Sequence, residues 1–283
     1  GAVERAREAI EAQNLGGGIV TAQILADQVT GQDSWTPLSE RAAKDRTWAY
    51  GHIVFDEAQE LSPMAWRALL RRCPSRSFTV VGDLDQRRGN KRPPTWEKAL
   101  GPAARAFTAE YALTVSYRTP ATLTTLAEGV VARAGAPVLY PMTAVRDVDD
   151  CYRVTHVDAP EDAPASSKDN SPLWRTVAQA QREAEERLDR EAGTSRGRIA
   201  IIVGNERARA WGADMAGETA LSERVSLLSA VASKGLEFDS VVLVEPAEII
   251  SDGVGDLFVA LTRATHDVHV VHSAALPAGM EDW

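Results

Sequence analysis

Two short apolar runs, each leading into acidic residues, constrain the fold of this chain more than any other feature. The run from residue 52 to residue 55 leads into Asp56 and Glu57, and the run from residue 77 to residue 81 leads into Asp83. Such runs are typical of buried parallel strands, whose carboxyl ends gather at one edge of a sheet. Ligands bind at that edge in α/β proteins, so the pattern predicts an α/β fold with a site at this edge.

The segment between the two runs has the pattern of a helix. Ser62 and Pro63 form a suitable N-cap and first-turn pair. Met64, Leu69 and Leu70 recur behind them at helical spacing. Strand, helix and strand therefore follow one another, as in an α/β unit.

The alternation continues along the chain. We expect further strands at 113–116, 151–157, 199–203, 225–229, 240–244 and 268–272, and helices at 120–134, 173–190 and 256–264. The first 50 residues are mostly helical in pattern, with a turn at residues 16–18, and residues 158–171 have the composition of a loop.

The composition is that of a soluble folded protein. Of the 283 residues, 44% are hydrophobic and 25% are charged, and 31 basic against 40 acidic groups give a net charge of −9. This negative charge argues against a protein whose main function is to bind phosphate backbones. The chain has no apolar run of the roughly 18 residues that a bilayer span needs, and its start is unlike a signal peptide. We expect a cytoplasmic protein without a membrane partner.

The acidic pair at Asp56 and Glu57 has two interpretations when taken alone. Adjacent carboxylates at a strand end can hold Mg²⁺ and activate a water molecule, as hydrolysis of a nucleoside triphosphate requires. They can equally be capping acids at a turn between a strand and a helix.

Further strings downstream favour the first interpretation. After the string Asp56 to Gln59 come four more, in this order: Gly82 to Gln86, Tyr117 to Thr119, Lys234 to Asp239, and Ala260 to Ala264. Together the five strings resemble motifs II, III, IV, V and VI of the UvrD/Rep-like superfamily 1 helicases. The resemblance covers nearly the whole chain downstream of Ala49. It implies RecA-like domains, that is, parallel sheets of the P-loop NTPase type with flanking helices, and an ATP hydrolase that uses ATP and Mg²⁺.

The resemblance also implies catalytic roles. Asp56 matches the residue that holds Mg²⁺, Glu57 the residue that activates water, and Gln86 the residue that senses the γ-phosphate. Arg118 and Arg263 match two arginines that reach the γ-phosphate. A guanidinium suits this task because its planar donors neutralise charge on a transferring phosphoryl group.

Four more residues match positions that bind the nucleotide itself. Tyr117 matches the aromatic residue that stacks on adenine, and Glu237 matches a residue that contacts the ribose. Gln59 and Gly235 lie in the matched strings and are implied to contact the nucleotide as well.

Within the superfamily, the run from Trp48 to Met64, followed by Arg71 to Ser77, is similar to the HelD-type factors of actinobacteria. Members of that group are helicase-like ATPases that bind RNA polymerase and release it from stalled or drug-bound complexes. The resemblance therefore implies RNA polymerase as a partner.

The sequence departs from the family in its phosphate-binding loop. A G-x-x-x-x-G-K-[ST] string occurs nowhere in the chain, although in this family it precedes motif II. We therefore interpret residues 1–112 as the C-terminal part of a first RecA-like motor domain and residues 113–283 as a complete second one. Without that loop MgATP loses most of its phosphate contacts, so we expect this polypeptide alone to be inactive and to need the upstream part of the same motor.

A second departure concerns DNA. UvrD-like enzymes carry aromatic residues just after the motif III glutamine, which stack on single-stranded bases. Here residues 87–91 are basic or polar without an aromatic residue, and Val231 replaces the histidine expected before motif V. These changes weaken a DNA-tracking function. The 115 residues between Arg118 and Lys234 also leave no room for a large inserted domain.

Three hypotheses stay open at this point. The chain is part of a HelD-type ATPase that recycles RNA polymerase, part of a DNA helicase or translocase, or a non-catalytic interaction module that retains the motor fold.

Overall fold

The computed structural model describes residues 49–89, 91–158, 171–212, 219–222 and 224–281. These residues divide into two compact units, one with residues 49–55 and 63–79 and the other with residues 56–62 and the described residues from Val80 onward. Asp56, Glu57 and Gln86 therefore belong to the second unit, and the expected domain boundary near residue 112 stays a prediction. The helices and turn expected in the first 50 residues, and the expected loop except for its two end residues, lie outside the described residues.

The first unit contains the predicted strand, helix and strand. Strand β1 (Ile53–Phe55) pairs with β2 (Phe78–Val80), and α4 (Pro63–Arg72) lies between them in sequence. Trp66 and Cys73 are fully buried in this unit.

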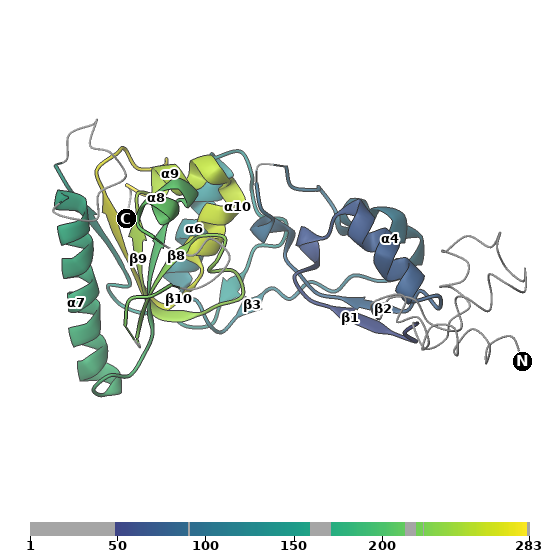
Figure 1. Ribbon diagram of the computed structural model, residues 1–283, viewed down its shortest axis with the longest axis horizontal. Helices are drawn as coiled ribbons and strands as arrows, with labels where there is room; N and C mark the ends of the chain where they lie inside the picture. Colours follow the sequence, from purple (N-terminus) through teal and green to yellow (C-terminus); the bar gives the residue numbers. More distant parts are fainter. Residues whose placement is uncertain (1–48, 90, 159–170, 213–218, 223, 282–283) are drawn as a thin grey trace, which may run out of the picture. The chain divides into compact units, whose positions relative to one another are not determined.

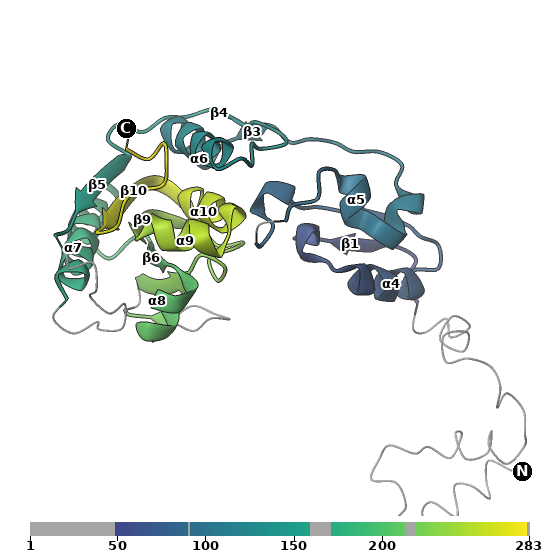
Figure 2. The same cartoon turned by 90° about the horizontal axis from the view of Figure 1, so that it is seen from above.

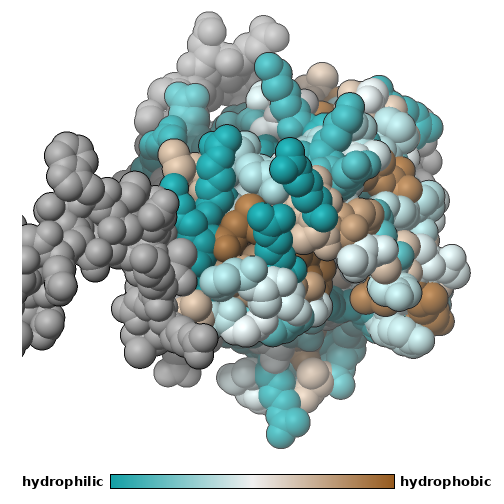
Figure 3. All heavy atoms as spheres, turned by 90° about the vertical axis from the view of Figure 1, so that its right-hand side faces the viewer, coloured by the Kyte–Doolittle hydropathy of each residue, from teal (hydrophilic) through white to brown (hydrophobic). Residues whose placement is uncertain are grey.

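The prediction that β1 is a buried strand was wrong. The Val54 side chain is 68% exposed, and Met64 on α4 is 72% exposed. Figure 3, which views the face of the molecule that carries α4, shows apolar atoms at the surface between hydrophilic side chains. The reason is that β1 and β2 form a sheet of two strands, so the described residues leave one face of β1 uncovered.

The second unit is built around a six-stranded sheet with the strand order β5-β10-β9-β6-β8-β7 (Figure 1). Its strands are β5 (Tyr152–His156), β6 (Ile199–Val203), β7 (Thr219–Ala220), β8 (Val225–Ser229), β9 (Phe238–Val244) and β10 (Ala264–His272). All neighbours pair in parallel except β7, which is antiparallel to β8. The predicted α/β class with a parallel sheet is confirmed.

Helices cover both faces of this sheet (Figures 1 and 2). The helices of the unit are α5 (Trp96–Leu100), α6 (Ala121–Arg133), α7 (Pro172–Ala192), α8 (Asn205–Ala210), α9 (Pro246–Asp252) and α10 (Val254–Leu261). Short 3₁₀ turns are η2 (Ala58–Glu60), η3 (Leu84–Gln86) and η4 (Gly101–Ala106), and β3 (Val115–Ser116) pairs with β4 (Thr143–Ala144).

Two hydrophobic cores form because successive strand residues point to opposite faces. In β6, Ala200 and Ile202 pack with α6 and α10, whereas Ile201 and Val203 pack with α7 and α8. All five β6 residues are buried, as expected for a strand covered on both sides. None of the described helices is long and apolar enough to cross a membrane.

A buried histidine on β10 gives a testable pH dependence. His269 is 7% exposed, and its Nε2 lies 2.8 Å from the hydroxyl of Thr155. Burial lowers the pKa of His269, and the charge of Arg153 lowers it further. The unfolded chain therefore binds the proton more readily, so the free energy of unfolding should fall by up to about 1 kcal/mol as the pH drops below the ordinary histidine pKa.

Chemical denaturation at pH 7.5 and pH 5.5 measures this effect. His269→Gln should flatten the difference, whereas His156→Gln, at a side chain that is 57% exposed, should retain it. An equal pH dependence in wild type and His269→Gln would show that another group is responsible.

Candidate functional site

The acidic pair lies at a sharp turn that follows β1. Glu57 adopts the left-handed conformation with φ 53° and ψ 36° and precedes η2, a conformation that is uncommon for residues other than glycine. The carboxylate of Asp56 accepts a hydrogen bond of 2.8 Å from the Glu57 backbone N–H. The backbone N–H of Ala58 donates to the carbonyl of Val81, 3.1 Å away, which ties this turn to the segment that follows β2.

Gln59 holds the two acidic loops together. Its side chain is 1% exposed, and its Nε2 donates to Glu57 Oε2 at 2.5 Å. Its Oε1 accepts from the backbone N–H of Asp83 at 3.2 Å. A Cβ atom on Gly82 would lie 2.4 Å from this oxygen, so the approach requires glycine. In this structure Gln59 thus orients the Glu57 carboxylate.

The loop after β2 presents Gln86 through a network of its own. Asp83 caps η3 by accepting from the Asp85 N–H at 2.9 Å, and Gln86 Nε2 donates to the other carboxylate oxygen of Asp83 at 3.0 Å. Burial raises the pKa of Asp83, although the Gln86 hydrogen bond and the charge of Arg263 act in the opposite direction. The side-chain oxygen of Gln86 is left to face the next group.

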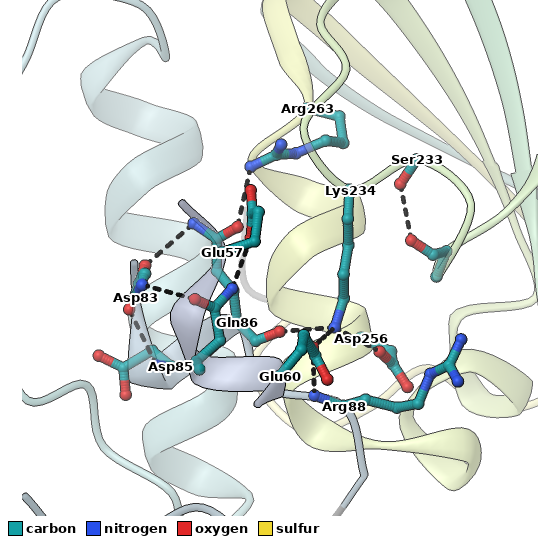
Figure 4. A network of polar contacts seen from close by, with 12 residues as sticks. Glu57, Glu60, Asp83, Asp85, Gln86, Arg88, Ser233, Lys234, Asp256 and Arg263 are labelled. Atoms are coloured by element: carbon teal, nitrogen blue, oxygen red, sulfur yellow. Dashed lines mark hydrogen bonds and ion pairs between the residues drawn. The ribbon is translucent and has the colours of Figure 1, made fainter. Parts of the chain in front are cut away.

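That group is Arg263, which follows α10 and is only 6% exposed. Its guanidinium donates to the carbonyls of Val259 and Leu236 at 3.2 and 3.3 Å. It also donates to Gln86 Oε1 at 3.4 Å (Figure 4). Burial lowers the pKa of Arg263, and the nearby charge of Arg118 lowers it further. Among the described residues, no carboxylate forms an ion pair with this buried cation.

Two glutamates and a glycine lie close to this cluster. Gly235 adopts φ 73°, and a Cβ atom on it would lie 3.8 Å from Glu57 Oε1. The charges of Glu57 and Glu237 both act on Arg263 and oppose the lowering of its pKa. Glu237 forms an ion pair with Arg118, in which both side chains are about half exposed.

The structure therefore brings Glu57, Gln86, Gly235 and Arg263 together, with Arg118 and Glu237 paired within electrostatic range. Asp56 and Tyr117 are both exposed, and Tyr117 is 74% exposed. Asp56 directly precedes Glu57 in the chain, and Tyr117 directly precedes Arg118.

Sequence reasoning assigned no role to four residues that support the site. Asp83 and Glu60 lie in the two acidic loops, and Lys234 joins them from the segment before β9. Asp256 is 1% exposed. A single acid within the apolar stretch from Val254 to Leu261 was the signal that could have identified Asp256.

No family model matches the chain, and no curated protein matches it. Solved structures do match. Arterivirus nonstructural protein 10, a helicase, aligns over 83% of this chain and 42% of its own, with 16% identity and a TM-score of 0.43. The same arterivirus protein in complex with DNA aligns over 78% and 40%, with 18% identity and a TM-score of 0.41.

A third match is the C-terminal domain of a possible DNA helicase from Lactobacillus plantarum WCFS1. It aligns over 58% of this chain and 92% of its own, with 18% identity and a TM-score of 0.35. The chain spans about two fifths of the length of the two arterivirus structures.

Proposed function

We propose that this chain is the C-terminal portion of an ATP-dependent motor of the UvrD/Rep-like superfamily 1 type. The observation that carries the proposal is the contact between Gln86 and Arg263. These residues are 177 positions apart in sequence, and they come from two of the five strings that resemble helicase motifs. Gln86 and Arg263 are joined by a hydrogen bond, and the charge of Glu57 acts on Arg263. The resemblance implies that these three residues surround the γ-phosphate of ATP.

The electrostatics of this cluster suit a phosphate. Arg263 is buried without a carboxylate ion pair among the described residues, and the charges of Glu57, Glu237 and Asp83 act on it only without such a contact. An anion that arrives beside Gln86 would give this cation a direct partner. The guanidinium could then stabilise the negative charge that develops on the transferring phosphoryl group.

Magnesium fits the acidic turn through Asp56. Mg²⁺ bound with ATP keeps several water ligands and contacts the phosphates, so one or two carboxylates from the protein suffice. Asp56 is exposed, and its Oδ1 carries one hydrogen bond from the backbone. MgATP would supply the phosphoryl group, while Glu57 would orient and deprotonate the attacking water and Gln86 would contact the γ-phosphate.

The nucleoside part of ATP would contact a separate set of residues. We assign adenine stacking to Tyr117, whose ring is largely exposed, and ribose contact to Glu237. Arg118 would leave its ion pair with Glu237 to reach the γ-phosphate. Gln59 and Gly235 would shape the site around Glu57.

Exposed apolar side chains support an incomplete first motor domain. Val54 is 68% exposed, and Tyr111 and Leu113, which precede β3, are 87% and 88% exposed. Large apolar side chains of this kind normally pack against other apolar groups, and an apolar strand residue such as Val54 normally packs inside a sheet that is covered on both faces. We propose that an upstream segment with the phosphate-binding loop covers them, that residues 1–112 end the first RecA-like domain, and that residues 113–283 form the second.

For the partner, we propose RNA polymerase, with the chain as part of a HelD-type factor that releases the polymerase. The support is the sequence similarity around the acidic turn and the lack of a stacking aromatic residue after Gln86. The alternative is a DNA helicase, in which Arg87, Arg88 and Lys91 would contact phosphates. A non-catalytic module is the third alternative.

Hydrolysis of MgATP tests the proposal. The longer protein should release phosphate from MgATP, and Glu57→Gln should abolish that release, whereas residues 1–283 alone should show no turnover above background. Turnover by residues 1–283 that Glu57→Gln removes would contradict an incomplete motor. Absence of Glu57-dependent turnover in the longer protein would contradict the ATPase and leave the non-catalytic module.

The partner is tested with the same longer protein. Release of stalled RNA polymerase that requires hydrolysable ATP would support the HelD-type function. Salt-dependent binding to a single-stranded oligonucleotide, with stimulation of hydrolysis by that oligonucleotide, would favour the DNA helicase instead.

A further inference from the structure

Lys234 joins three segments that lie far apart in the sequence. Its Nζ donates to Glu60 Oε1 on η2 and to the backbone carbonyl of Gln86, each at 2.7 Å. Asp256 Oδ1 on α10 lies 3.6 Å from the same nitrogen. Figure 4 shows the ammonium group of Lys234 pointing into this cluster of oxygens. A lysine ammonium has three donors, and here two of them are used in hydrogen bonds while Asp256 lies within ion-pair distance.

The environment of Lys234 differs from that of a surface ion pair. Its side chain is 12% exposed and that of Asp256 is 2% exposed. Asp256 Oδ1 has no hydrogen-bond partner among the described residues, and Lys234 forms an ion pair with this buried carboxylate. Removing one member of such a buried group leaves an uncompensated charge. The geometry of the cluster is therefore strongly determined.

The same loop is packed tightly against the start of α10. A Cβ atom on Gly255 would lie 2.4 Å from the carbonyl oxygen of Arg87, and one on Gly253 would lie 3.0 Å from the backbone nitrogen of Gly89. The backbone N–H of Arg88 also donates to Glu60 Oε1 at 3.1 Å. The loop backbone is thus fixed on both sides of the carbonyl that Lys234 binds.

We propose that Lys234 is a positioning residue that sets the Gln86 side chain between Asp83 and Arg263. Lys234 fixes the carbonyl of Gln86, and the side chain of Gln86 starts from that same residue and reaches both neighbours. The assignment rests on the proposed ATPase function. In this role Lys234 connects the segment before β9 and helix α10 to Gln86. These two elements would then control the position of the Gln86 side chain, which contacts the γ-phosphate.

Steady-state hydrolysis of MgATP by the longer protein tests this role. Lys234→Met retains the length of the side chain and removes its donors, so kcat should fall about 100-fold while KM for MgATP stays within about threefold. Lys98→Met is the matched control, because Lys98 is exposed on α5, and it should retain wild-type kcat.

A second variant keeps the test valid if Lys234→Met folds poorly. Glu60 is partly exposed, so Glu60→Ala should fold normally while it removes one anchor of Lys234. We expect kcat to fall about tenfold without a change in KM, and we expect the double variant with Lys234→Met to lose little more than Lys234→Met alone, because both act through one contact.

The outcomes separate the two proposals. Wild-type turnover with unchanged kcat in both Lys234→Met and Glu60→Ala overturns the positioning role and leaves the ATPase intact. A loss that follows only a lowered melting temperature, with KM and kcat of the folded fraction unchanged, also overturns it. Absence of any turnover that Glu57→Gln removes overturns the ATPase and this assignment with it.

Discussion

Replacing Arg263 by alanine is expected to lower kcat for MgATP about 1,000-fold in the longer protein, as loss of an arginine at a transferring phosphoryl group does. The guanidinium is held by the carbonyls of Val259 and Leu236 and faces Gln86. Its position is therefore set before any nucleotide arrives, which is the arrangement that stabilises a transition state best. Phosphate release under saturating MgATP measures the effect.

Nucleotide binding distinguishes this role from a structural one. MgADP has no γ-phosphate, so its affinity should stay within about threefold in Arg263→Ala, while the affinity for a non-hydrolysable ATP analogue should fall. Arg209→Ala, at an exposed position on α8, is the matched control and should leave both affinities and kcat unchanged. Equal loss of MgADP and analogue binding in Arg263→Ala would assign the residue to folding of the site.

The sequence predicted the central strands of the second unit well because β6 is a continuous apolar run and β8 and β9 are rich in apolar residues. The expected strands at 199–203 and 225–229 coincide with β6 and β8 residue for residue, and the others differ at their ends. The short elements α5, α8 and α9 escaped prediction, since five to seven residues hold too little periodicity. The burial of β1 was predicted wrongly for a different reason. Its apolar residues indicate burial, but the cover for Val54 is absent from the described residues.

Only some side chains of the candidate site could be predicted from the sequence, and the contacts that connect them could not. Glu57, Gln86 and Arg263 came from motif resemblance, and the structure places them together. The contact of Lys234 with the Gln86 loop could not be predicted, because a hydrogen bond to a backbone carbonyl does not depend on the type of the residue that carries the carbonyl. The pairing of Arg118 with Glu237 was equally hidden. Resemblance assigned both to a nucleotide, whereas in this structure each neutralises the other.

Close packing between α10 and the loop after β2 gives the second large effect. Gly255→Val is expected to lower the free energy of unfolding by about 3 kcal/mol, because overpacking at a rigid contact forces backbone shifts. A Cβ atom at this position would lie 2.4 Å from the carbonyl oxygen of Arg87 and 2.9 Å from that of Asp85. Both obstacles are backbone atoms, so no side chain can rotate away.

A second helical glycine supplies the control, and the two should respond with opposite signs. A Cβ atom on Gly129 in α6 would meet only the end of the Arg133 side chain, at 3.4 Å. Gly129→Ala should therefore raise the free energy of unfolding by about 0.5–1 kcal/mol, as alanine does inside a helix. Gly255→Ala should lower it despite the same gain in helix propensity. Urea denaturation of the two alanine variants measures the contrast, and stabilisation by Gly255→Ala would show that α10 and the loop separate freely.

Gly255→Ala should also lower kcat in the longer protein, because the displaced segment includes the Gln86 carbonyl that Lys234 binds. One substitution therefore links the packing of α10 to the geometry of the proposed ATP site.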